Sequence, residues 1–224
     1  MPKSLIITID GPVAAGKSAV GTELASRLEY KFVDTGVMYR ALTWAVLRDK
    51  VDPNDEIAVT ELSKRTEIQI DNGINPRDPQ IIVDGENITS DLRTADVEKG
   101  VPLISRYDGV RQSMVSRQRQ LASTGMLIMA GRDIGTVVLP DADLKIFLTA
   151  SPEERARRRH IDIEGSGQIT DYSKVLDGLI QRDKIDTERH NSPLKPASGA
   201  HILTTDGITL TEVVDFILAL AETG

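Results

Sequence analysis

The sequence predicts an α/β fold in which helices cover both faces of a five-stranded parallel sheet. Two observations support this prediction: apolar runs alternate with segments of helical periodicity, and the first run leads into a glycine-rich turn and a helix. Strands that are covered on both faces are expected to be continuously apolar. With 224 residues, the chain is long enough for one such domain with a small insertion.

Five apolar runs are the predicted strands of this sheet. They are rich in β-branched and other large apolar residues and are bounded by turn residues or helical patterns. In chain order they are LIITID (5–10), KFVD (31–34), MLIMAG (126–131), LKIFLT (144–149) and HILTTD (201–206). The last two are followed by predicted helix starts, a capping box of Ser151 and Glu154 with Pro152 at the first helical position, and a second box of Thr209 and Glu212.

A region from about residue 66 to residue 106 breaks the alternation of strands and helices. Two runs with period-two apolar spacing, EIQI and IIVDGENIT, stand on either side of the turn-rich segment DNGINPRDP. Such spacing across a short connection is typical of antiparallel pairing. We therefore expect residues 66–106 to form a small antiparallel insert within a single domain spanning residues 1–224.

The composition limits the kinds of site that the chain can hold. A net charge of −7 and a pI near 5.1 argue against nucleic acid or a membrane surface as the main partner. The absence of cysteine excludes disulfides, thiolate nucleophiles and cysteine metal sites. The histidines, at positions 160, 190 and 201, lack metal-ligand spacing and are expected to be ordinary surface or core residues. With no signal-peptide pattern and no apolar run of membrane-spanning length, we expect a cytoplasmic protein.

The turn after the first strand has the pattern GxxxxGK[ST], in the stretch GPVAAGKS. A strand, a tight turn and a helix start in this order suit phosphate binding, because backbone N–H groups and the helix dipole converge on phosphate oxygens. Lys17 would then bridge the terminal phosphates, and Ser18 would be a ligand of Mg²⁺. A glycine turn with a solvated lysine is the alternative. The context favours a nucleoside triphosphate site.

Residues that follow the strands are the next candidates, since ligands of open α/β sheets bind beyond the carboxyl ends of the strands. DTGVMYRAL follows the second strand, so Asp34 and Thr35 are either ligand contacts or helix N-caps. GRDIGTVVLP follows the third strand and places Arg132 and Asp133 between two glycines, which would let the backbone approach a ligand. A surface salt bridge is the alternative there.

Two groups of charged residues occur late in the chain. In KVLDGLIQRDKIDTERH, spacings of four and three put Arg182, Asp186 and Arg189 on one helix face, in line with Val175 and Leu179. This face is either a solvated ladder of charges or part of a cleft at the sheet edge. The second group, ERARRRH, packs four arginines into residues 154–160, and like charges so close repel one another unless an anion is near. A triphosphate would supply that anion.

The chain resembles the bacterial cytidylate kinases, within the nucleoside monophosphate kinases, over essentially its whole length. Four segments carry the resemblance: GPVAAGKS, VDTGVMYRA, MAGRDIGTVVLPDADLKIFLTAS and QRDKIDTERHNSPL. The combination of DTGxMYR with GRDxGTVV is far more specific than the phosphate loop alone. The resemblance implies a P-loop kinase fold, transfer of the γ-phosphoryl group of ATP to CMP or dCMP, Mg²⁺ as cofactor, and a monomer.

The resemblance also implies roles for individual residues. ATP would be held by Gly11, Pro12, Val13, Ala14, Ala15, Gly16, Lys17, Ser18 and Ala19. The acceptor phosphate would be held by Arg40, Arg132 and Arg189, the pentose by Thr35, Arg182 and Asp186, and the cytosine by Arg111 and Asp133. Catalytic charge neutralisation would come from Lys17, Arg132, Arg158 and Arg189. Residues 155–170 match the mobile lid, with Gly165 and Gly167 as hinge candidates, and residues 66–106 match the monophosphate-binding insert.

Two departures from the family pattern accompany these expectations. Ala14 replaces a glycine that is frequent in the loop, a change that small residues tolerate. Pro102 stands where we expect a serine that helps to read cytosine, so the strictness for cytosine stays open. Two other functions also stay open: a kinase for another small acceptor, such as UMP or a metabolite alcohol, and a regulatory NTPase switch, which would need an Mg²⁺-binding aspartate and a water-positioning residue. The many arginines favour a second phosphate-bearing ligand.

Overall fold

The computed structural model describes residues 5–71, 79–165, 167, 169–189 and 191–223; most of the predicted turn-rich segment (72–78), Ser166, Gln168 and His190 lie outside these residues. All five predicted strands are present. They are β1 (Ile6–Asp10), β2 (Lys31–Asp34), β6 (Leu127–Gly131), β7 (Leu144–Thr149) and β8 (His201–Thr204). Every neighbouring pair is parallel, in the order β2-β6-β1-β7-β8. The predicted fold class is therefore confirmed.

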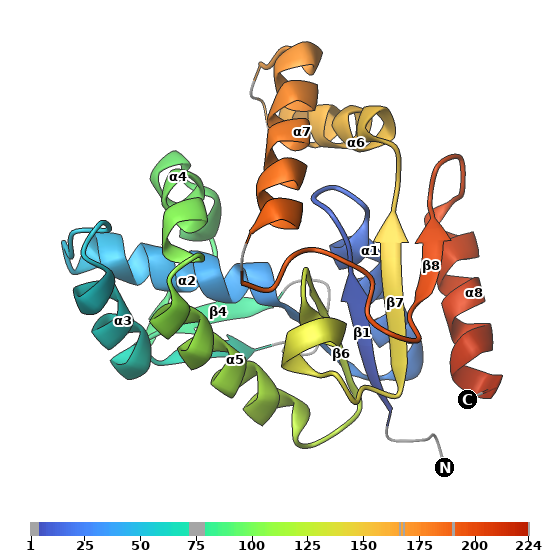
Figure 1. The fold of residues 1–224 in the computed structure, drawn as a ribbon, viewed down its shortest axis with the longest axis horizontal. Coiled ribbons are helices and arrows are strands. Elements are labelled where there is room, and N and C mark those ends of the chain that lie inside the picture. Colours follow the sequence, from blue (N-terminus) through green and yellow to red (C-terminus); the bar gives the residue numbers. More distant parts are fainter. Residues whose placement is uncertain (1–4, 72–78, 166, 168, 190, 224) are drawn as a thin grey trace.

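Helices cover both faces of this sheet (Figure 1). They are α1 (Lys17–Leu28), α2 (Thr35–Arg48), α3 (Glu56–Arg65), α4 (Ala95–Ile104), α5 (Asp108–Ala122), α6 (Pro152–Gly165), α7 (Tyr172–Glu188) and α8 (Leu210–Thr223), with a 3-10 turn, η1 (Asp91–Arg93), and a π-turn, η2 (Ile134–Val138). α1 and α8 pack together on one face, and α2 and α5 lie on the other. Among the described helices, none combines the length and the apolar character that a membrane crossing requires.

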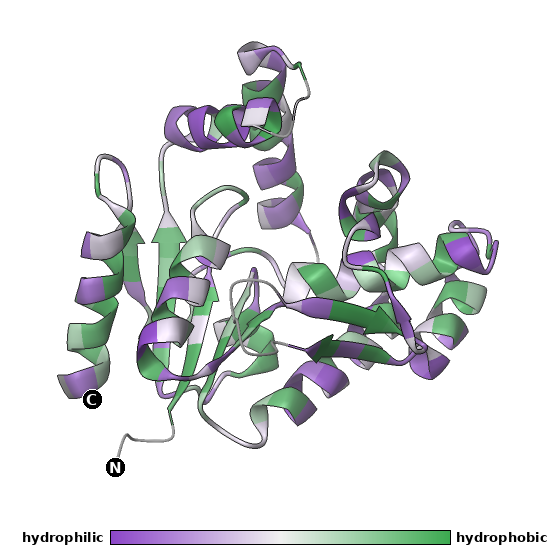
Figure 2. Cartoon of the chain, turned by 180° about the vertical axis from the view of Figure 1, so that it is seen from behind, coloured by the Kyte–Doolittle hydropathy of each residue, from purple (hydrophilic) through white to green (hydrophobic). Residues whose placement is uncertain are grey.

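The strands alternate between two apolar cores, one on each face of the sheet. In β6, Ile128 and Ala130 face the core beneath α1 and α8, whereas Leu127 and Met129 face the core beneath α2 and α5. Both sets are buried, which is why the strands are apolar at nearly every position. Figure 2 shows this apolar colour along the central strands and a predominantly hydrophilic α6.

The predicted antiparallel insert is present as a three-stranded sheet within residues 68–87, whereas the later part of the predicted range 66–106 holds η1 and α4. Its strands are β3 (Ile68–Asp71), β4 (Gln80–Val83) and β5 (Glu86–Asn87), and they pair in the order β3-β4-β5. Asp84 and Gly85 connect β4 to β5, both with positive φ (50° and 86°), as a tight two-residue hairpin requires. Ile81 and Val83 are buried in the core that includes α2. The insert is thus anchored on the same helix that follows β2.

Of the two predicted capping boxes, one forms completely and one only by half. At α8, the Glu212 N–H donates to Thr209 Oγ1 (3.3 Å) and the Thr209 N–H donates to Glu212 Oε2 (2.8 Å). At α6, the Glu154 N–H donates to Ser151 Oγ (3.2 Å), but the Ser151 N–H donates to the carboxylate of Asp206. The Glu154 carboxylate binds arginines of its own helix instead. The reciprocal half of that prediction is wrong, because Asp206, beyond β8, supplies a closer acceptor.

α6 and α7 pack against each other and stand beyond the carboxyl ends of the strands (Figure 1). His160 belongs to this pair of helices: its ring contacts Tyr172 edge-on, and its Nε2 lies 3.1 Å from the Thr170 carbonyl. His201 is exposed on β8. The described part of the chain holds no group of three or more histidine or acidic side chains arranged to bind a metal.

Candidate active site

The carboxyl ends of the parallel strands bring several sequence-predicted residues to one edge of the sheet. The glycine-rich loop follows β1, Asp34 and Thr35 follow β2, and Arg132 and Asp133 follow β6. The carboxyl end of α7, which carries Asp186, reaches the same edge, because Asp186 pairs with Arg132. Segments that are far apart in the sequence therefore meet where ligands of α/β sheets bind.

The glycine-rich loop has a backbone that its two fixed glycines make possible. Gly11 has φ 150°, and a Cβ on it would lie 2.1 Å from the carbonyl oxygen of Leu148. Gly16 has φ 93° and is the N-cap of α1, where the described part of the chain provides no side-chain cap. The first N–H groups of a helix have no intrahelical acceptor, so those of α1 are free to meet an anion.

Ala14 adopts a left-handed backbone conformation, with φ 61°. Its side chain is small, as expected for a residue that replaces glycine here. A left-handed backbone conformation, however, costs any residue with a Cβ about 1 to 2 kcal/mol. The glycine that is frequent at this position would carry no such cost. The departure at Ala14 is therefore one of backbone strain rather than of size.

Lys17 folds back over the loop, and its Nζ donates to the Pro12 carbonyl at 2.6 Å. Burial, and after it the guanidinium of Arg132, lowers the pKa of Lys17 to about 8, although the carboxylates of Asp34, Asp10 and Asp186 act in the opposite direction. The ammonium group thus lies between the phosphate loop and the residues that follow β6. In this place it can interact with a phosphate that extends from one towards the other.

Ser18 and Asp34 form an oxygen-rich pair at the start of α1. The Ser18 hydroxyl donates to Asp34 Oδ2 at 2.7 Å, while Asp34 Oδ1 accepts from the Gly36 N–H at 2.9 Å and so caps α2. Thr35 is not the cap: it is buried, and its hydroxyl donates to the Ala130 carbonyl. A carboxylate and a hydroxyl are hard oxygen ligands of the kind that Mg²⁺ prefers. Sequence reasoning left Asp34 open as a cap or a ligand contact, and the geometry makes it a cap that also faces Ser18.

Two buried aspartates organise the arginines on the other side of the site. Asp186 (side chain 4% exposed) lies 2.7 Å from Arg132 Nε and 3.6 Å from Arg182 Nε. Asp133 pairs with Arg111 and lies 3.8 Å from Arg189 Nη2. Four arginines around two carboxylates leave two positive charges in excess. This cluster suits a ligand that carries a phosphate dianion.

Burial affects the charges of this arginine cluster. Burial is the main reason why the pKa of Arg132 is lowered to about 10, and burial also lowers the pKa of Arg189. Both guanidinium groups stay protonated at neutral pH, so their charge is held in a poorly hydrated environment. An incoming anion would therefore interact with them more strongly than with solvated arginines.

Two residues of the segment DTGVMYR lie near this cluster: Tyr39, which had no predicted role, and Arg40, a predicted contact of the acceptor phosphate. Tyr39 lies among these charges, and burial raises the pKa of its phenol. Arg40 Nε pairs at 2.9 Å with Glu98, on α4 of the insert. Arg40 is also close enough to help lower the pKa of Arg132. The pattern DTGVMYR contains Tyr39, but nothing in the sequence pairs Arg40 with a carboxylate that lies 58 positions further on.

The glycines that flank Arg132 and Asp133 have a structural role besides the one predicted. A Cβ on Gly131 would lie 2.6 Å from both Thr35 Oγ1 and Ile134 Cδ1, and a Cβ on Gly135 would lie 3.0 Å from Thr8 Oγ1. These glycines are needed because other parts of the protein pack against them. That they also let the backbone approach a ligand stays a prediction.

The charged face of α7 turns inward. Leu179 and Asp186 are buried, Val175 is half-buried, and Arg189 is the C-cap with extended ψ 138°, so its side chain leaves the helix towards Asp133. The interpretation of this face as a solvated ladder is wrong for Asp186, which is 3% exposed.

The arginine-rich segment of α6 is neutralised largely by the protein itself. Arg155 is buried, forms a two-pronged pair with Asp183, and donates to the Val13 carbonyl of the phosphate loop (3.2 Å). Arg157 and Arg158 pair with Glu154. Repulsion among these arginines therefore does not by itself require an external anion. A Cβ on Gly16 would lie 3.8 Å from Arg158 Nη1, so Arg158 is beside the loop.

Three further residues from the sequence analysis lie apart from this cluster. Among the described residues, no atom beyond the chain neighbours lies within 4 Å of a Cβ added at Gly165 or Gly167, and Gly167 has φ 80°. Pro102 is exposed and lies within α4.

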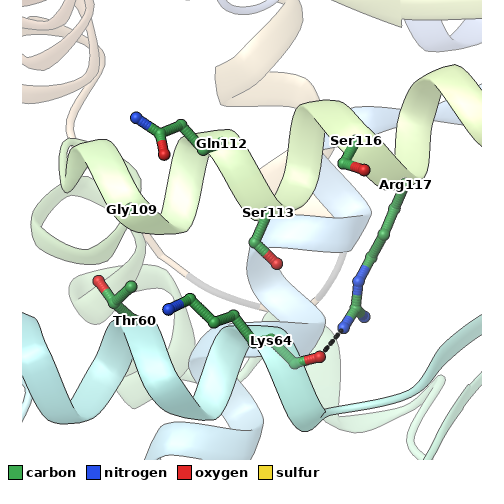
Figure 3. Close-up of a pocket in the computed structure, with 7 residues that line it drawn as sticks. All are labelled: Thr60, Lys64, Gly109, Gln112, Ser113, Ser116 and Arg117. Carbon is green, nitrogen blue, oxygen red and sulfur yellow. Dashed lines mark hydrogen bonds between the residues drawn. The ribbon is translucent and has the colours of Figure 1, made fainter.

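A polar groove of about 490 Å³ lies elsewhere, between α3 and α5 (Figure 3). Its lining residues are Thr60, Lys64, Gly109, Gln112, Ser113, Ser116 and Arg117. Arg117 donates to the carbonyls of Ser63, Lys64 and Thr66, so it caps the carboxyl end of α3. This contact holds α3 to α5 and accounts for the arginine without a ligand.

Comparisons with known proteins agree with the geometry of the site. A family model described as "Cytidylate kinase" matches residues 7–223. The chain is 44% identical to the cytidylate kinase of Bacillus velezensis over 222 residues and to that of Bacillus subtilis over 223 residues, in each case covering 99% of this chain and 98% of the relative. Among solved structures, a gluconokinase from Sinorhizobium meliloti has a similar fold, with a TM-score of 0.50 and 17% identity over 100% of this chain and 97% of that one. An uncharacterized protein from Eubacterium ventriosum gives a TM-score of 0.52 at 12% identity, over 98% of this chain and 99% of that chain.

Proposed function

Because the chain belongs to the cytidylate kinase family, we propose that it transfers the γ-phosphoryl group of ATP to CMP or dCMP, giving ADP and CDP or dCDP. The observation that carries this proposal is the presence of two anion-binding arrangements at one sheet edge. One is the phosphate loop at the start of α1, and the other is the cluster of four arginines around two buried aspartates. A switch that only hydrolyses a nucleotide needs the first arrangement but not the second.

On the donor side, residues 11–19 would hold the phosphates of ATP. Ser18 and Asp34 would hold Mg²⁺, because they present two oxygens side by side and Mg²⁺ commonly takes one or two protein ligands together with phosphates and water. The metal would supply charge neutralisation on the phosphates. Lys17 lies beside this pair, and it would neutralise the charge that develops during transfer.

On the acceptor side, Arg40, Arg132 and Arg189 would hold the phosphate of the monophosphate. Thr35, Arg182 and Asp186 would contact the pentose. Arg111 and Asp133 would contact the cytosine, whose exocyclic amine can donate to a carboxylate, whereas uracil has no such donor. Since a loose phosphoryl-transfer transition state is served mainly by alignment and charge neutralisation, this set of residues needs no strong general base.

The helix pair α6 and α7 would act as a lid over both ligands. Arg155 already ties α6 to the phosphate loop, and Arg158 lies beside that loop and would join Lys17 in charge neutralisation. Closure of residues 155–170 would exclude water and so favour transfer over hydrolysis. Residues 66–106 would form the monophosphate-binding insert, to which Arg40 is linked through Glu98. The proposal keeps the monomer that the family resemblance implies.

The direct test is a coupled assay of ADP formation with ATP, Mg²⁺ and a panel of monophosphates. We expect turnover to depend on CMP or dCMP and to be much slower with UMP, AMP or GMP. The Lys17→Ala variant is the matched control for background ATPase activity. Brisk ATP hydrolysis that no monophosphate changes would refute the kinase proposal in favour of a switch.

A further inference from the structure

Asp10 is a buried carboxylate that the proposed mechanism does not use. It is the last residue of β1, directly before the phosphate loop, and it is 2% exposed. Its Oδ1 accepts from the Ile134 N–H and its Oδ2 accepts from the Gly135 N–H, each at 2.7 Å. Both carboxylate oxygens thus accept hydrogen bonds from the backbone of a segment that begins 124 residues further along the chain.

That segment is the start of the π-turn η2, which directly follows Arg132 and Asp133. The N–H groups at the start of a helical turn have no acceptor within the turn, and here they are buried. The carboxylate satisfies two of them and places a negative charge at the positive end of the turn. It therefore fixes the backbone within one or two residues of both acceptor-site side chains.

The far end of the same turn is held by a different residue. Arg119, on α5, donates from Nε to the Val138 carbonyl (2.9 Å) and from Nη2 to the Val137 carbonyl (2.8 Å). The turn is thus held by an anion at its start and by a cation at its end. Only the first contact adjoins the acceptor site and the phosphate loop.

Burying the charged carboxylate of Asp10 costs free energy, which indicates a role for this residue other than packing. Burial raises the pKa of Asp10 to about 6, even though the two backbone N–H groups and Lys17 act to lower it, and Asp133 adds to the increase. The ionised carboxylate is therefore less stable here than in water. A residue that costs stability at the edge of a site is a candidate for a positioning role.

We propose that Asp10 is a positioning residue that holds the loop carrying Arg132 and Asp133 in register with the phosphate loop. It does not touch either substrate. Its two hydrogen bonds set the distance between the acceptor phosphate and the γ-phosphate of ATP, and misplacement of reacting groups by about 1 Å can cost about 100-fold in rate. This inference rests on the proposed function.

The test compares Asp10→Asn with Arg119→Gln by steady-state kinetics and thermal melting. An asparagine keeps the shape but can accept from only one of the two N–H groups and presents an amide donor to the other. We expect Asp10→Asn to raise the KM for CMP and to lower kcat, each by about tenfold or more, while the KM for ATP stays within about threefold. Arg119→Gln should change the melting temperature but leave the KM for CMP within about threefold.

A second variant covers the case in which Asp10→Asn does not fold. A Cβ in Gly135→Ala would lie 3.3 Å from Asp10 Oδ2 and 3.0 Å from Thr8 Oγ1, so it displaces the turn from the carboxylate without changing any charge. We expect the same pattern in smaller amplitude. Unchanged CMP kinetics in the folded variant, or an equal effect from Arg119→Gln, would overturn the positioning role. If the wild-type chain itself formed no ADP in response to CMP, the proposed function would fail instead.

Discussion

Replacing Asp186 with alanine tests the arginine cluster most directly. Its side chain is 4% exposed and lies 2.7 Å from the buried Arg132. The Asp186→Ala variant leaves the guanidinium of Arg132 buried and without this partner, whose charge opposes the lowering of the Arg132 pKa by burial. Breaking a buried ion pair by removing one partner costs about 3 to 5 kcal/mol of the free energy of unfolding. For a domain of this size, the melting temperature should fall by about 6 to 20 °C.

The same substitution should weaken binding of the acceptor. Asp186 forms close ion pairs with Arg132 and Arg182, and loss of one partner of a desolvated charge pair costs about 2 to 5 kcal/mol in binding. We expect the KM for CMP and dCMP to rise at least about tenfold and the KM for ATP to stay within about threefold. Asp186→Asn retains one acceptor for Arg132, so its effects should be intermediate.

The assay is a titration of each substrate, with a thermal melt of the same preparation. Asp177→Ala is the matched control, since Asp177 is exposed on the same helix and a surface substitution there should change stability by less than about 0.5 kcal/mol. A melting temperature and a KM for CMP at wild-type values in Asp186→Ala would show that the buried pair neither stabilises the fold nor forms the acceptor site.

Four further predictions follow from the site. Lys17→Met should lower kcat by about 1000-fold without loss of the fold, measured by coupled assay and thermal melt; near-normal turnover would contradict the role of this lysine. The pKa of Lys17 is lowered to about 8 in the folded state, below its unfolded value of 10.5, so the unfolded state binds more protons between these two pH values. The free energy of unfolding of the wild type, measured by denaturant titration, should therefore rise from about pH 8 to pH 10.5 relative to that of Lys17→Met. Parallel pH curves for the two proteins would argue against burial of the ammonium group. Ala14→Gly should remove a left-handed strain of about 1 to 2 kcal/mol, partly offset by a more flexible unfolded chain, and so raise the melting temperature by a few degrees; a decrease would show that φ 61° carries no strain. Arg155→Lys should break the two-pronged pair with Asp183 and the contact with the loop, and raise the KM for ATP several-fold with little change for CMP; an unchanged KM for ATP would separate α6 from donor binding.

The parts of the fold that depend on local patterns were predictable. Continuous apolar runs gave all five strands of the parallel sheet, period-two runs gave the antiparallel insert, and Thr209 with Glu212 gave a complete capping box. At Ser151 the same local rule was half wrong, because a carboxylate beyond a neighbouring strand competes for the N–H group. Local sequence patterns predict contacts between residues that are close in the sequence, but not competition from residues that are distant in it.

The candidate site was predictable as a set of residues but not as a set of contacts. Sequence spacing placed Arg182, Asp186 and Arg189 together, yet it could not show that Asp186 turns inward to meet Arg132. The contacts of Arg155 with Asp183, and of Asp10 with the turn after β6, join segments that are far apart in the chain. Such contacts depend on the packing of the whole domain, and a single sequence does not reveal them.

The position of β1 has a consequence for how the protein is made. Among the described strands, β1 is synthesised before the others, but its partners are β6 and β7, and Ile6 lies opposite Leu127. At a synthesis rate of about 5 to 20 residues per second, this apolar strand waits roughly 6 to 24 seconds for a partner. During that interval both of its edges lack their native partners, and unpaired edges of an apolar strand are able to pair with other chains.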